Sequence, residues 1–304
     1  MDYIKRVAVF GAGALGSYYA GCFAAADFTT MFAAAHGRAE TLQQQGVRVN
    51  GRDLVLPVVT PADEDQPVDL VIVALKHHQL AAALDDIRPL LGPETMILSV
   101  LNGLDSEAVI AARYPRQKIL YCVAIGIDAV RQGNDVIVAN QGKLYFGEAT
   151  NVPVSPAVRR VQQALDRAGL AWETPEDMLR VLWWKFMMNV GINQASAVLR
   201  APYAVFQNSA AAQALLTMLM QEVVDLAGAA GINLTDKDLQ QWTPILHKLA
   251  PEAKTSMLQD IEAGRKTEVD IFAGKVVALG RQYGIATPAN AMILQMIRAL
   301  EDNS

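Results

Sequence analysis

Residues 6–16 read RVAVFGAGALG, a short apolar run followed by a glycine-rich turn. The run over residues 6–10 predicts a buried strand, because it is apolar, bounded by Gly11 and too short for a helix. Residues 14–26 are rich in small side chains and predict a helix. A strand that turns through glycines directly into a helix is the expected start of a parallel α/β sheet.

The turn has the pattern GxGxxG and consists of Gly11-Ala12-Gly13-Ala14-Leu15-Gly16. In this pattern the first glycine allows the tight turn, the second lets a pyrophosphate approach the backbone, and the third lets the helix pack closely on the sheet. The helix N-terminus adds N–H donors and the positive end of a dipole. We therefore expect this turn to bind a dinucleotide cofactor.

Strands and helices continue to alternate after the turn. Apolar runs predict strands at residues 29–34, 69–75 and 95–100, and intervening segments predict helices at residues 39–45, 79–91 and 106–113. Such alternation is typical of βαβ units. The fold class we expect for this half is therefore a Rossmann-type, doubly wound parallel sheet.

Short β segments complete the predicted sheet. Asn50-Gly51 suits a type I′ turn and predicts a hairpin between residues 47–49 and 54–56. Later runs at 119–127, 135–139 and 143–147, broken by Gly133-Asn134 and Gly142, leave no room for crossover helices. They predict an antiparallel extension. A helix at 156–169 and a strand at 171–173 complete this half.

From Pro175 onward the pattern predicts helices only. Helical periodicity covers residues 176–200, 209–230, 235–249, 251–283 and 288–300. Pro175 and the acidic residues after it suit a helix start. We expect a dinucleotide-binding domain over residues 1–174 and an all-α substrate and catalytic domain over residues 175–304. The length of 304 residues also favours two domains.

Composition and charge exclude several classes of protein. The formal net charge of -5 and a pI near 5.4 argue against a nucleic-acid partner. Residues 7–26 carry no charge and are long enough for a membrane span, but the glycines within them favour the strand–turn–helix interpretation. We therefore expect no membrane partner. Two cysteines, Cys22 and Cys122, fit the reducing cytosol.

The sequence leaves oligomeric state open and gives no sign of a metal. The four histidines show no metal-ligand spacing. The apolar helix predicted at residues 210–230 could form core or a dimer contact, with core as the default. A homodimer therefore stays open as a prediction.

The end of the second predicted strand bears on the choice between NADP and NAD. An acidic residue there would bind the ribose 2′-hydroxyl of NAD, and a basic residue would accommodate a 2′-phosphate. The strand ends Phe32-Ala33-Ala34-Ala35 without a carboxylate, and Arg38 follows. NADP (NADPH) is favoured, and NAD remains an alternative because Arg38 could equally be an ordinary residue of a helix start.

A polar stripe on the first helix of the second half is the strongest candidate for catalysis. Residues 182–193 are almost wholly apolar except for Lys185, Asn189 and Asn193. Steps of four residues place these side chains on one helix face within roughly 80°. One interpretation is a lysine that extends to solvent while the asparagines bind loops. The other is a lysine that lines a cleft between domains and acts as a general acid.

These residues together resemble the ketopantoate reductase family over essentially the whole chain. The resemblance depends on the glycine turn and on four further segments, taken in order: VALK at 73–76, LNG at 101–103, WWKFMMNVGIN at 183–193, and the segment that runs from SMLQD at 256–260 to KTEVD at 266–270. The family implies reduction of 2-dehydropantoate to pantoate with NADPH, a step of pantothenate and coenzyme A biosynthesis. The implied substrate is a small 2-oxo acid.

The resemblance also implies a role for each matching residue. Lys185 would donate the proton and Glu268 would bind the substrate hydroxyl, both as catalytic residues. Substrate-binding roles fall on Asn189, Asn193, Ser256 and Asn102, and cofactor-binding roles on the glycine turn, Arg38, Lys76 and Asn102. In one respect the chain departs from the family, because the usual arginine after the second strand falls on Ala35.

Two other functions stay open. Another NAD(P)-dependent dehydrogenase with a helical second domain would act on a different hydroxy acid or alcohol. A dinucleotide sensor without catalysis would bind partners through its helical half. The intact lysine and asparagine stripe favours an enzyme over a sensor, because a sensor needs no buried proton donor.

Overall fold

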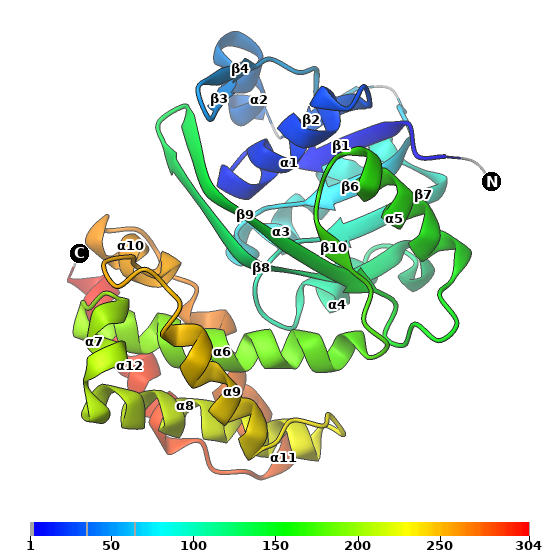
Figure 1. Cartoon of the computed structure of the whole chain (residues 1–304). Coiled ribbons are helices and arrows are strands. Elements are labelled where there is room, and N and C mark those ends of the chain that lie inside the picture. Colours follow the sequence, from blue (N-terminus) through cyan, green and yellow to red (C-terminus); the bar gives the residue numbers. More distant parts are fainter. Residues whose placement is uncertain (1–2, 35, 64, 304) are drawn as a thin grey trace. The chain divides into compact units, whose positions relative to one another are not determined.

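The computed structural model describes residues 3–34, 36–63 and 65–303 (Figure 1). The chain divides into two compact units, Met1–Leu179 and Arg180–Ser304. The division lies inside the long helix α6 (Met178–Leu199), a few residues beyond the boundary that the sequence suggests.

The first unit is built on a ten-stranded sheet with the order β4-β3-β9-β8-β7-β6-β1-β2-β5, and β10 pairs with β9. The strands are β1 (Arg6–Phe10), β2 (Thr29–Ala33), β3 (Val47–Val49), β4 (Arg52–Leu54), β5 (Val58–Val59), β6 (Val68–Val73), β7 (Leu91–Ser99), β8 (Ile119–Gln132), β9 (Asp135–Gly147) and β10 (Trp172–Glu173). Strands β5, β2, β1, β6, β7 and β8 pair in parallel. The predicted Rossmann-type sheet is confirmed.

Helices cover both faces of this sheet. They are α1 (Ala14–Ala25), α2 (His36–Gln45), α3 (His77–Ala83), α4 (Ser106–Ala111) and α5 (Pro156–Arg167), with 3₁₀ turns at Leu84–Leu90 and Arg116–Lys118. The helix predicted over residues 79–91 is shorter than expected. It gives way to the first 3₁₀ turn, which contains Pro89, a residue that cannot supply an N–H to an α-helix.

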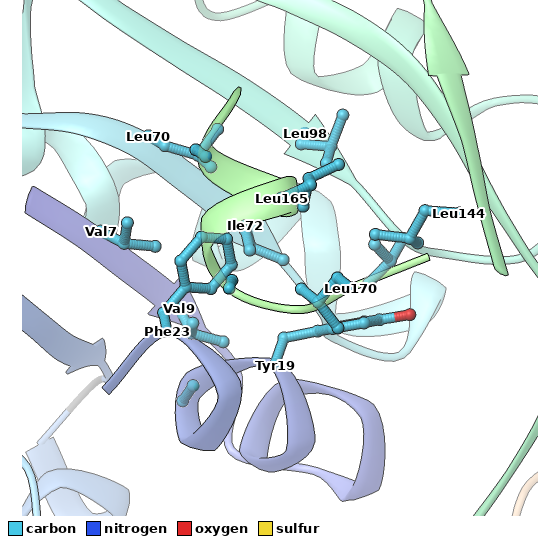
Figure 2. Close-up of a cluster of buried hydrophobic side chains, with 14 of the residues drawn as sticks. Val7, Val9, Tyr19, Phe23, Leu70, Ile72, Leu98, Leu144, Leu165 and Leu170 are labelled. Carbon is cyan, nitrogen blue, oxygen red and sulfur yellow. The ribbon is translucent and has the colours of Figure 1, made fainter. Parts of the chain in front are cut away.

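Alternate side chains of the central strands point into two separate cores. Val7 and Val9 of β1 belong to one buried cluster, whereas Ala8 and Phe10 belong to the other. Figure 2 shows the first cluster, in which strand residues meet side chains of α1 and α5: Val7, Val9, Leu70, Ile72, Tyr19, Phe23 and Leu165. Because both faces of the sheet are covered, side chains on both faces are buried, and the strands are therefore almost continuously apolar.

The antiparallel extension is also present, with one correction. Strands β8 and β9 form a long hairpin that turns at Gly133-Asn134, but Gly142 does not end a strand. Gly142 lies inside β9 at a φ of +61°, and a Cβ there would lie 2.6 Å from the carbonyl oxygen of Ile125. The predicted break is wrong because glycine instead keeps the two strands close. The hairpin at Asn50-Gly51 is confirmed, with both residues at positive φ.

The described residues of the second unit form helices joined by loops, without a strand. Its helices are α6, α7 (Tyr203–Asn208), α8 (Ala210–Ala229), α9 (Asp236–Leu246), α10 (Ser256–Glu262), α11 (Ala273–Tyr283) and α12 (Pro288–Asp302), with a 3₁₀ turn at Val269–Ile271. The continuous helix expected over residues 251–283 is wrong. Helix α10 ends at Glu262, and Gly264 follows at a φ of +60° that continues no helix.

Helix α8 is long and apolar enough to span a membrane by length and composition, and half of that span is buried. It also carries a buried carboxylate. Glu222 accepts hydrogen bonds from the backbone N–H groups of Ala289 and Asn290 at 2.7 and 3.0 Å, and from Asn290 Nδ2 at 2.7 Å. These bonds satisfy the N-terminus of α12. Helix α8 therefore packs as a core helix of this unit.

Candidate functional site

The cofactor residues predicted in the first unit lie along one edge of the sheet. Phe10, Val73 and Ser99 are aligned across β1, β6 and β7. The glycine turn, Lys76 and Asn102 therefore all follow the carboxyl ends of neighbouring parallel strands. Lys76 is exposed and Asn102 is half-buried. Ligands of open α/β sheets bind at this edge, where the connections from adjacent strands run in opposite directions.

The three glycines of the turn have different surroundings. Gly11 has a φ of +107°, and a Cβ there would lie 2.6 Å from the carbonyl oxygen of Ala74 on the neighbouring chain segment. A Cβ on Gly16 would collide with the Gly11 carbonyl, so only glycine lets α1 start this close to β1. A Cβ on Gly13 would meet only the Ala74 oxygen, at 4.0 Å. The protein itself therefore leaves room for a side chain at Gly13, and the absence of one leaves open space beside the turn.

The start of α1 fits an anionic ligand. Its N-cap residue, Gly13, offers no side-chain cap, and the first turn has no acidic residue. Ala12 is buried, and Ala14 and Leu15 are half-buried, so the turn is held by apolar packing. The free N–H groups and the positive end of the helix dipole favour a phosphate. These features fit the pyrophosphate of a dinucleotide.

The described residues at the end of β2 carry no carboxylate, as the sequence predicts. Phe32, Ala33 and Ala34 are buried and apolar, and the first turn of α2 has no acidic residue. Arg38 is exposed on α2. Ala35, where the family usually has an arginine, lies outside the described residues.

Arg131 joins this group of residues and was not predicted. It lies near the end of β8, and its Nη1 donates to the carbonyl of Ala12 in the glycine turn. Burial lowers the pKa of Arg131, and the positive charge of Arg38 lowers it further. The sequence offers no local signal for this contact, because 119 positions separate Arg131 from Ala12.

Glu107 is a second unpredicted group, next to the loop that carries Asn102. Ser99 and Ser106 flank the loop, and Ser99 Oγ donates to Ser106 Oγ at 2.8 Å. Ser106 donates to the Glu107 carboxylate at 2.9 Å, and the Cys122 N–H donates to it at 3.4 Å. Burial raises the pKa of Glu107 to about 7, and the hydrogen bonds oppose this only partly.

In the second unit, α6 carries the predicted stripe on one uninterrupted helix. Lys185 and Asn189 are half-buried, and Asn193 is 7% exposed. The helix is held closely against α8 at Gly191, where a Cβ would meet the side chain of Met220. Because α6 is uninterrupted from Met178 to Leu199, the three polar side chains share one face, as the spacing predicts.

Ser256 is placed beside this same face of α6. It is the exposed first residue of α10, whose N-cap Thr255 accepts a hydrogen bond from the Leu258 N–H at 3.2 Å. The Thr255 hydroxyl also bonds the Ser196 hydroxyl on α6 at 2.8 Å. Ser196 is eleven residues after Lys185, which is three helical turns and about 20° of rotation. The start of α10 is thus fixed to the side of α6 that carries Lys185.

Glu268 is half-buried in a segment that is anchored at both ends. Before it, Thr267 binds Glu301 through its N–H at 2.7 Å and its hydroxyl at 2.6 Å. After it, the Ala273 N–H donates to Gln194 Oε1 on α6 at 2.8 Å. The segment that includes Glu268 is therefore held between α12 and α6.

Two acidic residues of the family-like segments have structural partners. Asp260 pairs with Arg265 at 2.8 Å, and Asp270 pairs with Arg298 at 2.8 Å. Both ion pairs join residues of the second unit and give the two carboxylates a structural role. Over the described ranges, no group of three or more histidine, cysteine, aspartate or glutamate residues could hold a metal ion.

Family comparisons identify what this arrangement belongs to. The family described as ketopantoate reductase PanE/ApbA matches residues 7–151, and its C-terminal region matches residues 177–301. The chain belongs to the ketopantoate reductase family. This is an oxidoreductase family that uses a nicotinamide cofactor, so the resemblance predicted from the sequence is confirmed.

Individual relatives of the ketopantoate reductase family cover nearly the whole chain. The 2-dehydropantoate 2-reductase of Mesorhizobium japonicum is 28% identical over 97% of both chains. A structure of 2-dehydropantoate 2-reductase from Geobacter metallireducens GS-15 is 26% identical, with a TM-score of 0.85 over 98% of this chain and 100% of that one. D-mandelate dehydrogenase with NADH and anilino(oxo)acetate is similar in fold, with a TM-score of 0.89 at 23% identity over 98% and 99% of the chains.

Proposed function

We propose that this protein reduces 2-dehydropantoate, or a closely related 2-oxo acid, to the 2-hydroxy acid with NADPH. The observation that carries the proposal is the stripe of Lys185, Asn189 and Asn193 on α6, an apolar helix of a ketopantoate reductase family member. A half-buried ammonium that shares a helix face with two amides is suited to donate a proton to a carbonyl oxygen that gains negative charge during reduction.

Cofactor binding is assigned to the first unit. The N–H groups at the start of α1 would hold the pyrophosphate, and Gly13 would leave room for it. Lys76 and Asn102, which follow β6 and β7, would bind beside the nicotinamide half. Arg38 would lie near the adenosine half, which extends toward the end of β2 in such folds. When bound, NADPH supplies the hydride that adds to the C2 carbonyl carbon.

Proton transfer is assigned to Lys185. As the carbonyl carbon receives the hydride, the Lys185 ammonium gives its proton to the carbonyl oxygen, and the neutral amine is later reprotonated from water. A positioned acid of this kind contributes about 10²–10⁴-fold to rate. The products are the 2-hydroxy acid and NADP⁺, so the electrons and the proton balance.

The remaining residues of the second unit would position the substrate. Asn189 and Asn193, one and two turns after Lys185, would orient the lysine and the oxo acid. Ser256 is exposed at the start of α10 and would bind the substrate carboxylate. Glu268 would accept a hydrogen bond from the hydroxyl of the product.

Steady-state NADPH oxidation with a panel of 2-oxo acids tests the proposal. We expect the highest kcat/KM with 2-dehydropantoate and lower values with smaller or aromatic 2-oxo acids. The same panel with NADH tests the cofactor. Preference for an aromatic 2-oxo acid would instead indicate a different hydroxy-acid dehydrogenase, and NADPH binding without turnover of any 2-oxo acid would favour a sensor. Cytosolic location and a homodimer stay predictions, the latter testable by light scattering.

A further inference from the structure

Arg131 reaches the glycine turn from a part of the chain that is far away in sequence. It is the second-last residue of β8, at the tip of the long hairpin with β9 (Figure 1). Its Nη1 donates to the Ala12 carbonyl, and its Nε donates to the Gly133 carbonyl at 2.8 Å. The guanidinium is therefore held at a defined place beside the turn rather than extended into solvent.

The hairpin tip is fixed to the elements that follow β2. Asn134 Nδ2 donates to Gln45 Oε1 on α2 at 2.8 Å, and the Asn134 carbonyl accepts from the Arg48 N–H on β3 at 2.8 Å. Arg131 Nη2 also lies 3.4 Å from Asn134 Oδ1. The tip, Arg131 and α2 therefore form one connected group, and α2 is the helix that carries Arg38.

Charge around Arg131 favours an anion. Its contacts within the described ranges go to backbone carbonyls and one amide, and none is a carboxylate. Arg38 is close enough that its positive charge lowers the pKa of Arg131. Two nearby positive charges repel each other, and an anion bound between them would remove that repulsion. Guanidinium groups bind phosphate particularly well, through two parallel N–H donors.

The position of the pair indicates which phosphate it would bind. The pyrophosphate already has the N-terminus of α1, whereas the ribose of the adenosine half extends toward the end of β2. Phe32, Ala33 and Ala34 at that end are apolar and offer nothing to a ribose hydroxyl. A 2′-phosphate on this ribose would instead find Arg38 from α2 and Arg131 from the hairpin.

We propose that Arg131 is a specificity residue for the cofactor, which binds the 2′-phosphate of NADPH together with Arg38. The proposal rests on the proposed function in one respect, the use of NADPH. It explains how the chain can prefer NADPH although alanine stands at position 35, because the second guanidinium comes from a hairpin about a hundred residues later.

The test compares ligands that differ only in the 2′-phosphate. Isothermal titration of the full-length protein measures Kd for NADPH against NADH, and for 2′,5′-ADP against 5′-AMP. In Arg131→Gln we expect Kd for NADPH and for 2′,5′-ADP to rise about 10- to 100-fold, the range for loss of a charged hydrogen bond. Kd for NADH and for 5′-AMP should change less than about threefold, which is below 1 kcal/mol.

Controls separate specificity from folding and from general charge. Arg52→Gln removes one positive charge from exposed strand β4 and should leave all four Kd values unchanged. Arg131→Lys keeps the charge and should retain part of the preference for NADPH, which a merely structural role would not produce. Thermal unfolding of each variant checks that the hairpin remains folded.

Three outcomes would overturn the inference. Equal weakening of NADPH and NADH in Arg131→Gln would assign Arg131 to the pyrophosphate or to support of the turn. An unchanged preference for NADPH would make Arg131 irrelevant to the phosphate while the proposed function stands. Absence of any preference for NADPH in the unaltered protein would remove both this inference and the cofactor named in the proposed function.

Discussion

The candidate sites of the two units depend on different parts of the chain. In the first unit the proposed cofactor site is the backbone of the glycine turn, which has no side chains at Gly11, Gly13 and Gly16. In the second unit the proposed catalytic stripe on α6 consists of side chains spaced four residues apart. A backbone site fails when an atom is added, whereas a side-chain site fails when an atom is removed. The following predictions test this difference.

Removal of the Lys185 ammonium should have the largest effect. Lys185→Ala should lower kcat by about 10²–10⁴-fold, because the proton donor is lost. Kd for NADPH should stay unchanged, since cofactor binding is assigned to the other unit. Stopped-flow NADPH oxidation measures the first quantity and titration the second. Lys248→Ala removes an exposed lysine and should leave both unchanged; near-normal turnover of Lys185→Ala would exclude it as the acid.

The first unit contains a buried titratable side chain, Glu107. Its ionisation should change the stability of the protein with pH. Burial raises the pKa of Glu107 to about 7, above its value near 4.5 in the unfolded chain. The folded state then binds more protons between these values, so the free energy of unfolding falls as pH rises from about 4.5 to about 7, by up to about 3 kcal/mol. Glu107→Gln should remove that fall.

Urea unfolding at a series of pH values measures this contribution, with Glu94→Gln as an exposed control. The turnover number of Glu107→Gln at neutral pH should stay within about twofold of the unaltered protein, well below the effect of a general acid. A loss of turnover comparable with that of Lys185→Ala would assign Glu107 a catalytic role. The first unit would then also act through a side chain, which contradicts the comparison.

Addition of one methyl group should separate two glycines of the same turn. Gly16→Ala places a Cβ against the Gly11 carbonyl, so we expect the free energy of unfolding to fall by about 1–3 kcal/mol. Gly13→Ala meets no protein atom closer than 4.0 Å and should unfold normally. Its methyl group would instead occupy space needed by the pyrophosphate and raise Kd for NADPH about tenfold or more.

Differential scanning calorimetry and NADPH titration of the same two samples provide the comparison. Each variant is the control for the other, since the added atoms are identical. If Gly13→Ala bound NADPH normally, the space beside the turn would not be the site of the pyrophosphate.

Ser256→Ala should have the smallest effect of the series. Loss of one hydrogen bond to a substrate carboxylate should raise KM for the oxo acid about tenfold, with little change in Kd for NADPH. Initial rates at saturating NADPH measure this. Thr217→Ala, an exposed hydroxyl on α8, is the matched control. A rise in Kd for NADPH alone would move Ser256 from the substrate to the cofactor.

Local and periodic features of this chain could be predicted from the sequence. The strand, turn and helix at residues 6–25 and the shared face of Lys185, Asn189 and Asn193 depend only on neighbours a few positions away. The family resemblance added Ser256 and Glu268, whose roles no periodicity indicates. These candidate residues lie in short segments, so a single sequence is enough to propose them.

Contacts between distant segments could not be predicted. The bond from Ser196 to Thr255 and the bond from Thr267 to Glu301 decide where α10 and the Glu268 segment lie, and they join residues 59 and 34 positions apart. Helical periodicity over residues 251–283 gave no sign that Glu301 holds the chain in a non-helical form at Thr267. Arg131 was missed for the same reason, since nothing near it in sequence resembles the glycine turn.

The carboxylate of Glu222 has a consequence for synthesis of the chain. Its three donors belong to Ala289 and Asn290, 67 and 68 positions later, so this group stays hydrated while α8 has left the ribosome and α12 has not. We therefore expect the nascent helical unit to stay open around α8 until α12 emerges. We expect a chain that stops before residue 288 to expose an apolar α8 surface and to depend on chaperones or proteolysis, whereas a chain that includes α12 buries that surface.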